Sequence, residues 1–233
     1  MNRTYLNHTF FGINRPGRAQ LRALCEVIAT KYTGIGYVQG INFLAAAILY
    51  HCDPHVALYF TSYLFEDCEL CDVYREDMSG LHSHNKVIKN VIRMKCPEVY
   101  SHLVTQFDVE IECITTPWII DLFSSLIPLD LYKFFLEKFV QDRWTFVYKL
   151  IASIFKELYP SLSKLDDYSD ILLGAKDNIK TIDWLRTIKD SDFISLSEDE
   201  ISSCHLDTLP DETQSEEPGS IWRSLLTKTR IFR

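Results

Sequence analysis

Two polar side chains in this sequence could act together on a phosphate group. Gln39 lies between Gly36 and Gly40, at the entrance to an apolar run. This placement exposes one carboxamide on a backbone that can be approached closely. Arg3 lies upstream, next to a segment rich in aromatic residues. A guanidinium and a carboxamide presented from helical elements suit a phosphate group that is bound to another protein.

Other chemistry is less well supported by spacing. Cys68, Cys71, His82 and His84 are residue types that bind zinc, but their spacing is not that of a structural zinc finger. A chance pair of cysteines in a polar loop is the simpler interpretation. No Gly-x-x-x-x-Gly-Lys-Ser/Thr run occurs, so the chain is not expected to bind GTP as a P-loop enzyme.

Composition indicates a globular chain with an acidic end. The 233 residues are 47% apolar, which permits a substantial core. The net charge is −8, with ten acids and no bases in residues 190–217 and four bases and no acids in residues 218–233. Residues 1–189 are therefore nearly neutral, and bulk charge does not favour nucleic-acid binding. There is no apolar stretch of membrane-spanning length and no evident secretory signal, and the seven scattered cysteines are typical of a reducing cytosol.

The dominant hydrophobic period is helical. In residues 17–32, Leu21, Leu24 and Ile28 recur at intervals that place them on one helix face. No period-two strand and no Asn-Gly or Asp-Gly hairpin signal is evident. The sequence therefore predicts an all-α fold, an irregular stack of about ten helices. The expected helices span residues 17–32, 37–50, 54–65, 81–94, 97–107, 114–127, 128–139, 142–158, 168–173 and 177–189, with a loop over 66–80.

Two further expectations concern the middle of the chain. Thr115, Thr116 and Pro117 are expected to begin the helix of residues 114–127, because proline favours the first turn. The aromatic residues that follow are expected to lie in the core: Phe134, Phe135, Phe139, Trp144 and Phe146.

Composition changes near residue 190. Beyond it, Ser, Asp, Glu, Pro and Thr dominate, which favours an acidic, partly disordered tail. We therefore expect a folded domain over residues 1–190 and a tail over residues 191–233. A short amphipathic piece is expected near residues 196–201. Residues 221–226 could dock back or bind a partner, although a frayed end is the simpler interpretation.

The two segments around Arg3 and Gln39 together resemble the TBC domain family, the GTPase-activating proteins of Rab GTPases. That family has a motif of the form Ile-x-x-Asp-x-x-Arg-Thr that runs on to an aromatic residue, and its second half is matched by Arg3, Thr4, Tyr5 and Phe11. The family's Tyr-x-Gln-Gly-Met-Asn motif is met by Tyr37, Gln39, Gly40 and Asn42. Residues 117–128 look like its Trp…Leu-Phe…Leu-Pro stretch, and residues 139–148 like the aromatic, acidic region that follows. The resemblance covers residues 3 to 190.

The sequence departs from the family pattern at several positions. Leu6 stands where proline is usual, Ile41 where methionine is usual, Glu137 where aspartate is usual and Arg143 where glycine is usual. The aspartate of the first motif would fall before Met1, so the domain is expected to be truncated at its N-terminus.

The resemblance implies activation of a GTPase in trans. Arg3 would be the arginine finger, which neutralises charge on the transferring phosphoryl group, and Gln39 would be the glutamine finger, which holds the attacking water. Gly36 and Gly40 would let the backbone approach the nucleotide. The residues expected to orient the loop are Tyr37 and Asn42.

The implied partner is a Rab-family GTPase in its GTP form, which carries the GTP and Mg²⁺. The chain would then be an activator, with no cofactor or metal of its own. It would act in vesicle trafficking from the cytoplasm and reach endomembranes only through partners. One alternative is a TBC-like Rab-binding or scaffold module without GTPase-activating activity. A more distant one is an unrelated helical adaptor with a chance Gln-Gly turn.

Overall fold

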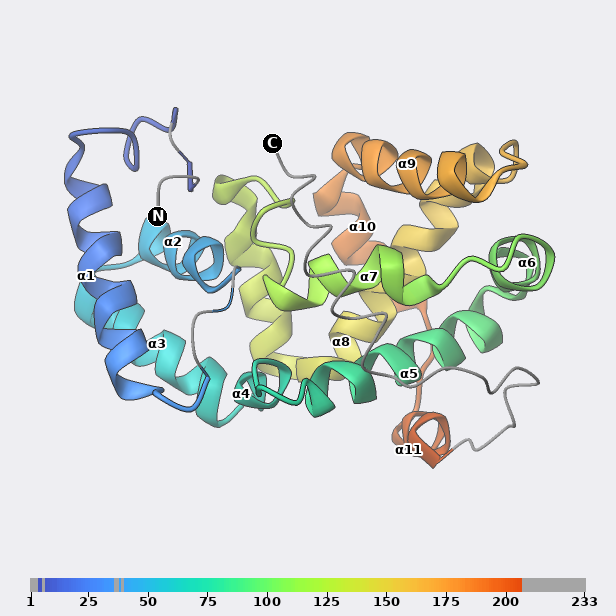
Figure 1. Ribbon diagram of the computed structural model, residues 1–233, viewed down its shortest axis with the longest axis horizontal. Helices are drawn as coiled ribbons and strands as arrows, with labels where there is room; N and C mark the ends of the chain where they lie inside the picture. The colour runs from blue at the N-terminus through green and yellow to red at the C-terminus, as the bar shows by residue number, and fades with distance from the viewer. Residues whose placement is uncertain (1–3, 6, 36–37, 39, 207–233) are drawn as a thin grey trace.

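The computed structural model describes residues 4–5, 7–35, 38 and 40–206, and over these residues the chain is all helical, without a strand (Figure 1). This confirms the predicted fold class. Helices α1 to α3 form one end of the molecule, and the long helix α8 joins them to the other end (Figure 1). Among these residues, no helix is both long enough and apolar enough to cross a bilayer. The helices are α1 Pro16–Lys31, α2 Ile41–His51, α3 Pro54–Glu66, α4 Leu70–Val73, α5 Ser79–Lys95, α6 Pro97–Tyr100, α7 Ile111–Ile120, α8 Leu129–Leu162, α9 Tyr168–Asn178, α10 Trp184–Asp190 and α11 Glu198–Leu206.

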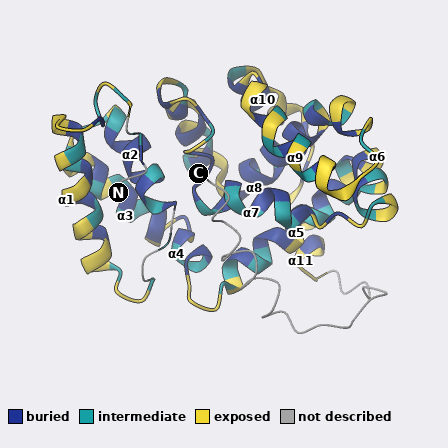
Figure 2. Cartoon of the chain, turned by 45° about the horizontal axis from the view of Figure 1, so that its top comes forward, coloured by how far each residue is buried: buried dark blue, intermediate teal, exposed yellow. Residues whose placement is uncertain are grey.

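Helix α2 is the buried centre of the N-terminal end. Its residues from Leu44 to Leu49 are all buried, because the segment is apolar on every side and packs between α1, α3 and α8 (Figure 2). The helix begins at Ile41 rather than at residue 37 as predicted. Gly40 has φ +136°, which is outside the helical region, so the helix cannot extend back through it.

The prediction for residues 114–127 is wrong at both ends. Helix α7 runs from Ile111 to Ile120, so Pro117 lies inside the helix rather than at its entry. The buried side chains of Ile111, Ile114 and Trp118 fix the packed face. The free energy gained by burying this face exceeds the cost of the one backbone hydrogen bond that is lost because Pro117 has no N–H. The chain then turns sharply, with φ of +46° at Leu122 and +60° at Phe123.

Helix α8 is bent at Arg143, where two separate helices were predicted. Arg143 has φ +50° and ψ −132°, and its side chain donates a hydrogen bond to the carbonyl of Asp67. The indole of Trp144 donates to the carbonyl of Cys68 at 3.0 Å. Both contacts hold the bend against the connection after α3. This connection was predicted to be a loop over residues 66–80, but it contains the short helix α4. Of the aromatic residues expected in the core, all are buried except Phe134, which lies on the outer face of α8.

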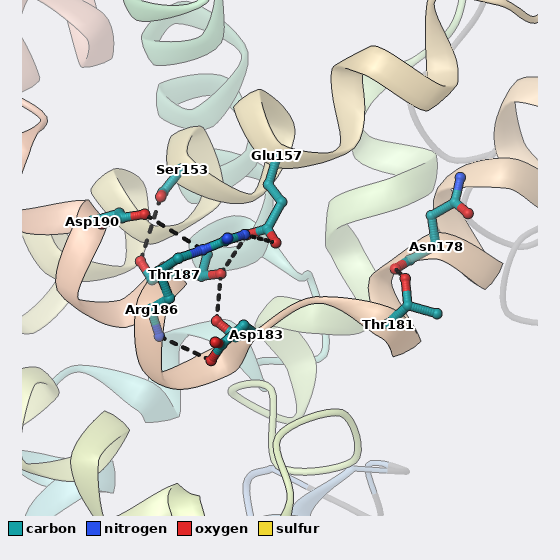
Figure 3. Close-up of polar contacts among 8 residues, drawn as sticks. All are labelled: Ser153, Glu157, Asn178, Thr181, Asp183, Arg186, Thr187 and Asp190. Carbon is teal, nitrogen blue, oxygen red and sulfur yellow. Dashed lines mark hydrogen bonds and ion pairs between the residues drawn. The ribbon is translucent and has the colours of Figure 1, made fainter.

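Helix α10 is held against α8 by a polar cluster centred on Glu157 (Figure 3). Arg186 Nη2 and Thr187 Oγ1 donate to its two carboxylate oxygens at 2.5 and 2.6 Å. Asp183 caps the start of α10 by accepting from the backbone N–H of Arg186 at 3.2 Å. Because Glu157 is partly buried, these contacts fix the orientation of α10 on α8.

The chain remains packed beyond residue 190, where the acidic tail was expected to begin. Helix α11 lies along α5, with an ion pair of 2.6 Å between Lys95 and Glu200. Asn90 Nδ2 donates to the carbonyl of Cys204 at 3.0 Å, and the Cys204 side chain is buried. The amphipathic piece predicted near residues 196–201 corresponds to the start of this helix. Residues 207–233 of the predicted tail lie outside the described residues.

The bend at Arg143 predicts an unusual order of stability. Its dihedral angles cost an L-residue about 1–3 kcal/mol, whereas glycine adopts them freely. Arg143→Gly and Arg143→Ala both lose the side-chain contact with Asp67, but only alanine keeps the strain. We expect Arg143→Gly to be more stable than Arg143→Ala by about 1–2 kcal/mol in urea unfolding. Alanine at least as stable as glycine would contradict this description of the bend.

Candidate functional site

The segments that contain the predicted finger residues meet through one buried hydrogen bond. Asn42 Nδ2 donates to Thr4 Oγ1 at 2.5 Å, although the two residues are 38 positions apart. Thr4 is fully buried and Asn42 is almost fully buried. Thr4 follows Arg3 directly in the sequence. The predicted site residues Arg3, Gly36, Tyr37 and Gln39 themselves lie outside the described residues.

Gly40 forms the corner that follows Gln39. Its N–H donates to Asn42 Oδ1 at 3.3 Å, so one Asn42 side chain contacts both segments. A Cβ atom at Gly40 would lie 2.8 Å from Ile120 Cγ2 and 3.1 Å from the Ile120 carbonyl oxygen. Glycine is therefore required both by the positive φ and by close packing on α7. The sequence predicts that Gly40 lets the backbone approach the nucleotide; in the structure Gly40 also packs closely on Ile120 of α7.

Tyr5 anchors the arginine-containing segment on the far side of Thr4. Its hydroxyl donates to the carbonyl of Ser124 at 2.5 Å, which links residues 119 positions apart. Its ring packs edge-on against Phe43 of α2, with ring centroids 5.5 Å apart, and lies tilted against Phe11 at 5.9 Å. The segment at Thr4 and Tyr5 is therefore fixed to α2 and to the turn that follows α7.

That turn, residues 120–124, is held by hydroxyl groups. Tyr74 donates to the carbonyl of Ile120 at 2.7 Å, and Tyr132 donates to the carbonyl of Leu122 at 2.9 Å. The Ser124 hydroxyl donates to the carbonyl of Asp121 at 2.6 Å. These contacts satisfy carbonyl groups that the end of α7 leaves without helical partners.

A carboxyl group lies buried within the same turn. Asp121 accepts hydrogen bonds from Ser125 and from the backbone of Phe123, but its Oδ1 atom has no hydrogen-bond partner in the described part of the chain. Burial raises the pKa of Asp121 to about 7, because removal of water outweighs these hydrogen bonds. The sequence interpretation missed this residue. The one feature of the sequence that could have indicated it is that Asp121 is the single acid within the apolar run of residues 114–127, where burial is expected.

The residues considered for zinc do not gather around a common point. His84 stacks on Trp144 with ring centroids 3.5 Å apart, and its Nδ1 is 2.7 Å from the Tyr148 hydroxyl. Burial lowers the pKa of His84 to about 3. Within the described ranges, no group of three or more potential ligands could hold a metal ion.

The chain matches the family model of the Rab-GTPase-TBC domain over residues 1–163. It belongs to this family. The match includes both segments joined by Thr4 and Asn42 and the turn on which they rest, so the TBC domain supplies the frame for this site.

Individual relatives of this TBC domain are distant. It is 24% identical over 181 residues to TBC domain-containing protein C4G8.04 of Schizosaccharomyces pombe, covering 77% of this chain and 23% of that protein. It is 24% identical over 186 residues to human small G protein signaling modulator 3, covering 72% and 25%. It is 21% identical to Rab GTPase-activating protein eat-17 of Caenorhabditis elegans, covering 99% and 26%. The chain thus spans only about a quarter of the length of these relatives.

The fold of this TBC domain is also shared with a solved structure. The crystal structure of the Chlamydomonas flagellar RabGAP TBC domain superimposes with a TM-score of 0.70 at 19% sequence identity. The match covers 83% of this chain and 64% of the other. This likeness supports the all-helical architecture.

The buried Asp121 predicts that stability falls as pH rises. Below about pH 4 the carboxyl is protonated in both the folded and unfolded states, so it contributes no difference. Between about pH 4 and 7 the unfolded chain loses this proton while the folded chain keeps it, which favours unfolding.

Asp121→Asn removes this penalty. We expect the variant to match the wild type near pH 4 and to exceed its free energy of unfolding by about 1–3 kcal/mol above pH 7. Denaturant unfolding at a series of pH values measures the difference. Asp130→Asn is the matched control, because Asp130 is an exposed carboxylate that accepts from Tyr50 at 2.6 Å. A gain for Asp121→Asn that is constant with pH would contradict the assignment.

Proposed function

We propose that this TBC domain accelerates GTP hydrolysis by a Rab-family GTPase, with Arg3 and Gln39 entering the GTPase active site in trans. The observation that carries the proposal is the buried hydrogen bond between Asn42 and Thr4. Together with the bond from the Gly40 N–H to Asn42 Oδ1, it links Thr4, which follows Arg3 in the sequence, to Gly40, which follows Gln39. The chain neighbours of the two proposed fingers, Thr4 and Gly40, are therefore held by the same asparagine side chain.

The residue types fit the chemistry of phosphoryl transfer. Negative charge spreads over the γ-phosphoryl and leaving oxygens in the transition state, and an arginine fork neutralises it with paired donors. Such a finger increases the rate by about 10³–10⁵. The Gln39 amide can accept from the attacking water while its NH₂ group donates to the phosphate. Holding that water in line supplies the second part of the acceleration.

The described contacts supply the rigidity that this mechanism needs. Thr4 and Tyr5 are each fixed by a hydrogen bond, to Asn42 and to Ser124 respectively. Gly40 is fixed by its close packing on Ile120 and by the hydrogen bond from its N–H to Asn42 Oδ1. A finger that is already oriented loses less entropy on docking. This favours activation over simple binding.

The proposed partner is the GTP form of the Rab, which brings the GTP and Mg²⁺. The TBC domain then needs no cofactor of its own. It would act from the cytoplasm and associate with endomembranes through the GTPase.

Single-turnover GTP hydrolysis across a panel of Rab proteins tests the proposal. Arg3→Lys should lower the acceleration by at least about a hundredfold, because lysine lacks the paired donors. Gln39→Ala should lower it by about tenfold or more. Both variants should bind the GTP-analogue form of the Rab within about threefold of the wild type, since they remove few contacts.

Arg15→Lys and Gln20→Ala are matched controls on the same end of the molecule, outside the two segments. They should keep the wild-type rate. A wild-type domain that binds a GTP-loaded Rab without accelerating hydrolysis would support the scaffold alternative. Neither binding nor acceleration across the panel would overturn the proposal.

A further inference from the structure

One turn supports both segments of the proposed site. A Cβ at Gly40 would lie 3.4 Å from Asp121 Cβ as well as against Ile120, so the corner after Gln39 rests on residues 120 and 121. Tyr5, two residues after Arg3, donates its hydroxyl to Ser124. A change in the shape of residues 120–124 would therefore move both segments.

Asp121 is the one buried acid in this turn. Its Oδ1 has no partner within the described residues, and the described titratable groups that face it are Tyr5, Tyr74 and Tyr132. Each of these tyrosines donates its single hydroxyl hydrogen to a backbone carbonyl of the turn. Asp121 accepts from Ser125 and from the backbone of Phe123, but the three tyrosine hydroxyls that face it are engaged elsewhere.

Resting on the function proposed above, we infer that Asp121 is a positioning residue for GTPase activation. Its neutral carboxyl keeps the turn in the form that holds both segments. Loss of its proton to solvent leaves a buried anion that draws a tyrosine hydroxyl away from the turn and loosens the arginine-containing segment.

The physical balance favours such a change. A buried carboxylate oxygen without donors is costly, and a hydrogen bond to an anion is about twice as strong as one to a neutral carbonyl. An ionised Asp121 therefore competes with the Ser124 carbonyl for the Tyr5 hydroxyl. Tyr5 is the tyrosine most able to respond, because it is partly exposed while Tyr74 and Tyr132 are buried.

Only Asp121 changes charge in this cluster near neutral pH. Its pKa is raised to about 7 by burial. Burial raises the pKa of Tyr5, Tyr74 and Tyr132 above their usual value of 10.0, so these groups stay neutral in the same range. The switch is therefore expected to act between about pH 6 and 8.5.

The test is the pH dependence of kcat/KM for GTP hydrolysis, measured with wild type and Asp121→Asn on a responsive Rab. The intrinsic rate of the Rab is measured at each pH and subtracted. The wild-type value should fall on the order of tenfold between pH 6 and 8.5. Asp121→Asn should keep, at pH 8.5, the value that the wild type shows at pH 6. Asp130→Asn should follow the wild-type profile. Wild-type and Asp121→Asn profiles of the same shape would overturn the inference.

A second measurement on the domain alone separates this inference from the proposed function. Amide hydrogen exchange of His8 and Gly12, whose N–H groups donate to the carbonyls of Tyr5 and His8, should lose protection above pH 7 in the wild type after correction for the intrinsic pH dependence of exchange. The same residues should stay protected in Asp121→Asn. This result would support the switch even if no Rab in the panel responded. Protection that does not change with pH would reject the switch even if the domain proved to be an activator.

Discussion

The hydrogen bond between the Asn42 amide and the Thr4 hydroxyl is the contact on which the site depends. All of α1 lies between these residues in the sequence, so the bond closes a loop of 38 residues. It is buried, so water does not compete for either partner, and breaking it would leave polar groups unpaired in the interior. The amide oxygen of the same side chain, Oδ1, accepts from the Gly40 N–H. One asparagine thus sets the relation between the two segments.

The turn after α7 is a shared support beneath these segments. It carries two consecutive residues with positive φ, and tyrosine hydroxyls from distant parts of the chain bind its carbonyls. The same close packing buries a carboxyl group without a full set of donors. The turn that supports both segments therefore also contains a buried acid.

Features that depend on neighbouring residues could be predicted from the sequence, whereas features that depend on contacts between distant residues could not. Local signals were sufficient for α3, which Asp53 and Pro54 begin, and for the face of α1, because capping and helical period are local. Pro117 was predicted to begin a helix but lies inside α7, because burial of the α7 face outweighs the preference of proline for the first helical turn. The bend at Arg143 could not be predicted from local sequence, because the residue that Arg143 contacts, Asp67, is 76 positions away. Helix α11 was largely missed because its polar sequence is held by partners on α5.

The same limit applies to the site. Asn42 was predicted to orient the loop from its motif, but its bond to Thr4 needs the fold. No sequence motif marks the contacts around Asp121. The residues that make them are far apart in the chain: Tyr74 and Ile120 are separated by 46 positions, and Tyr5 and Ser124 by 119. The family resemblance therefore predicts Arg3 and Gln39 as the residues that would touch the partner's nucleotide, whereas the contacts around Thr4, Tyr5 and Asp121 are visible only in the folded chain.

A double-mutant cycle on Thr4 and Asn42 tests the central claim most directly. Single-turnover GTP hydrolysis on a responsive Rab would be measured for Thr4→Val, Asn42→Ala and the pair. If the bond holds the two segments together, Thr4→Val should lower the rate in the wild-type background and have little further effect in Asn42→Ala. Independent losses that multiply in the double variant would contradict this account.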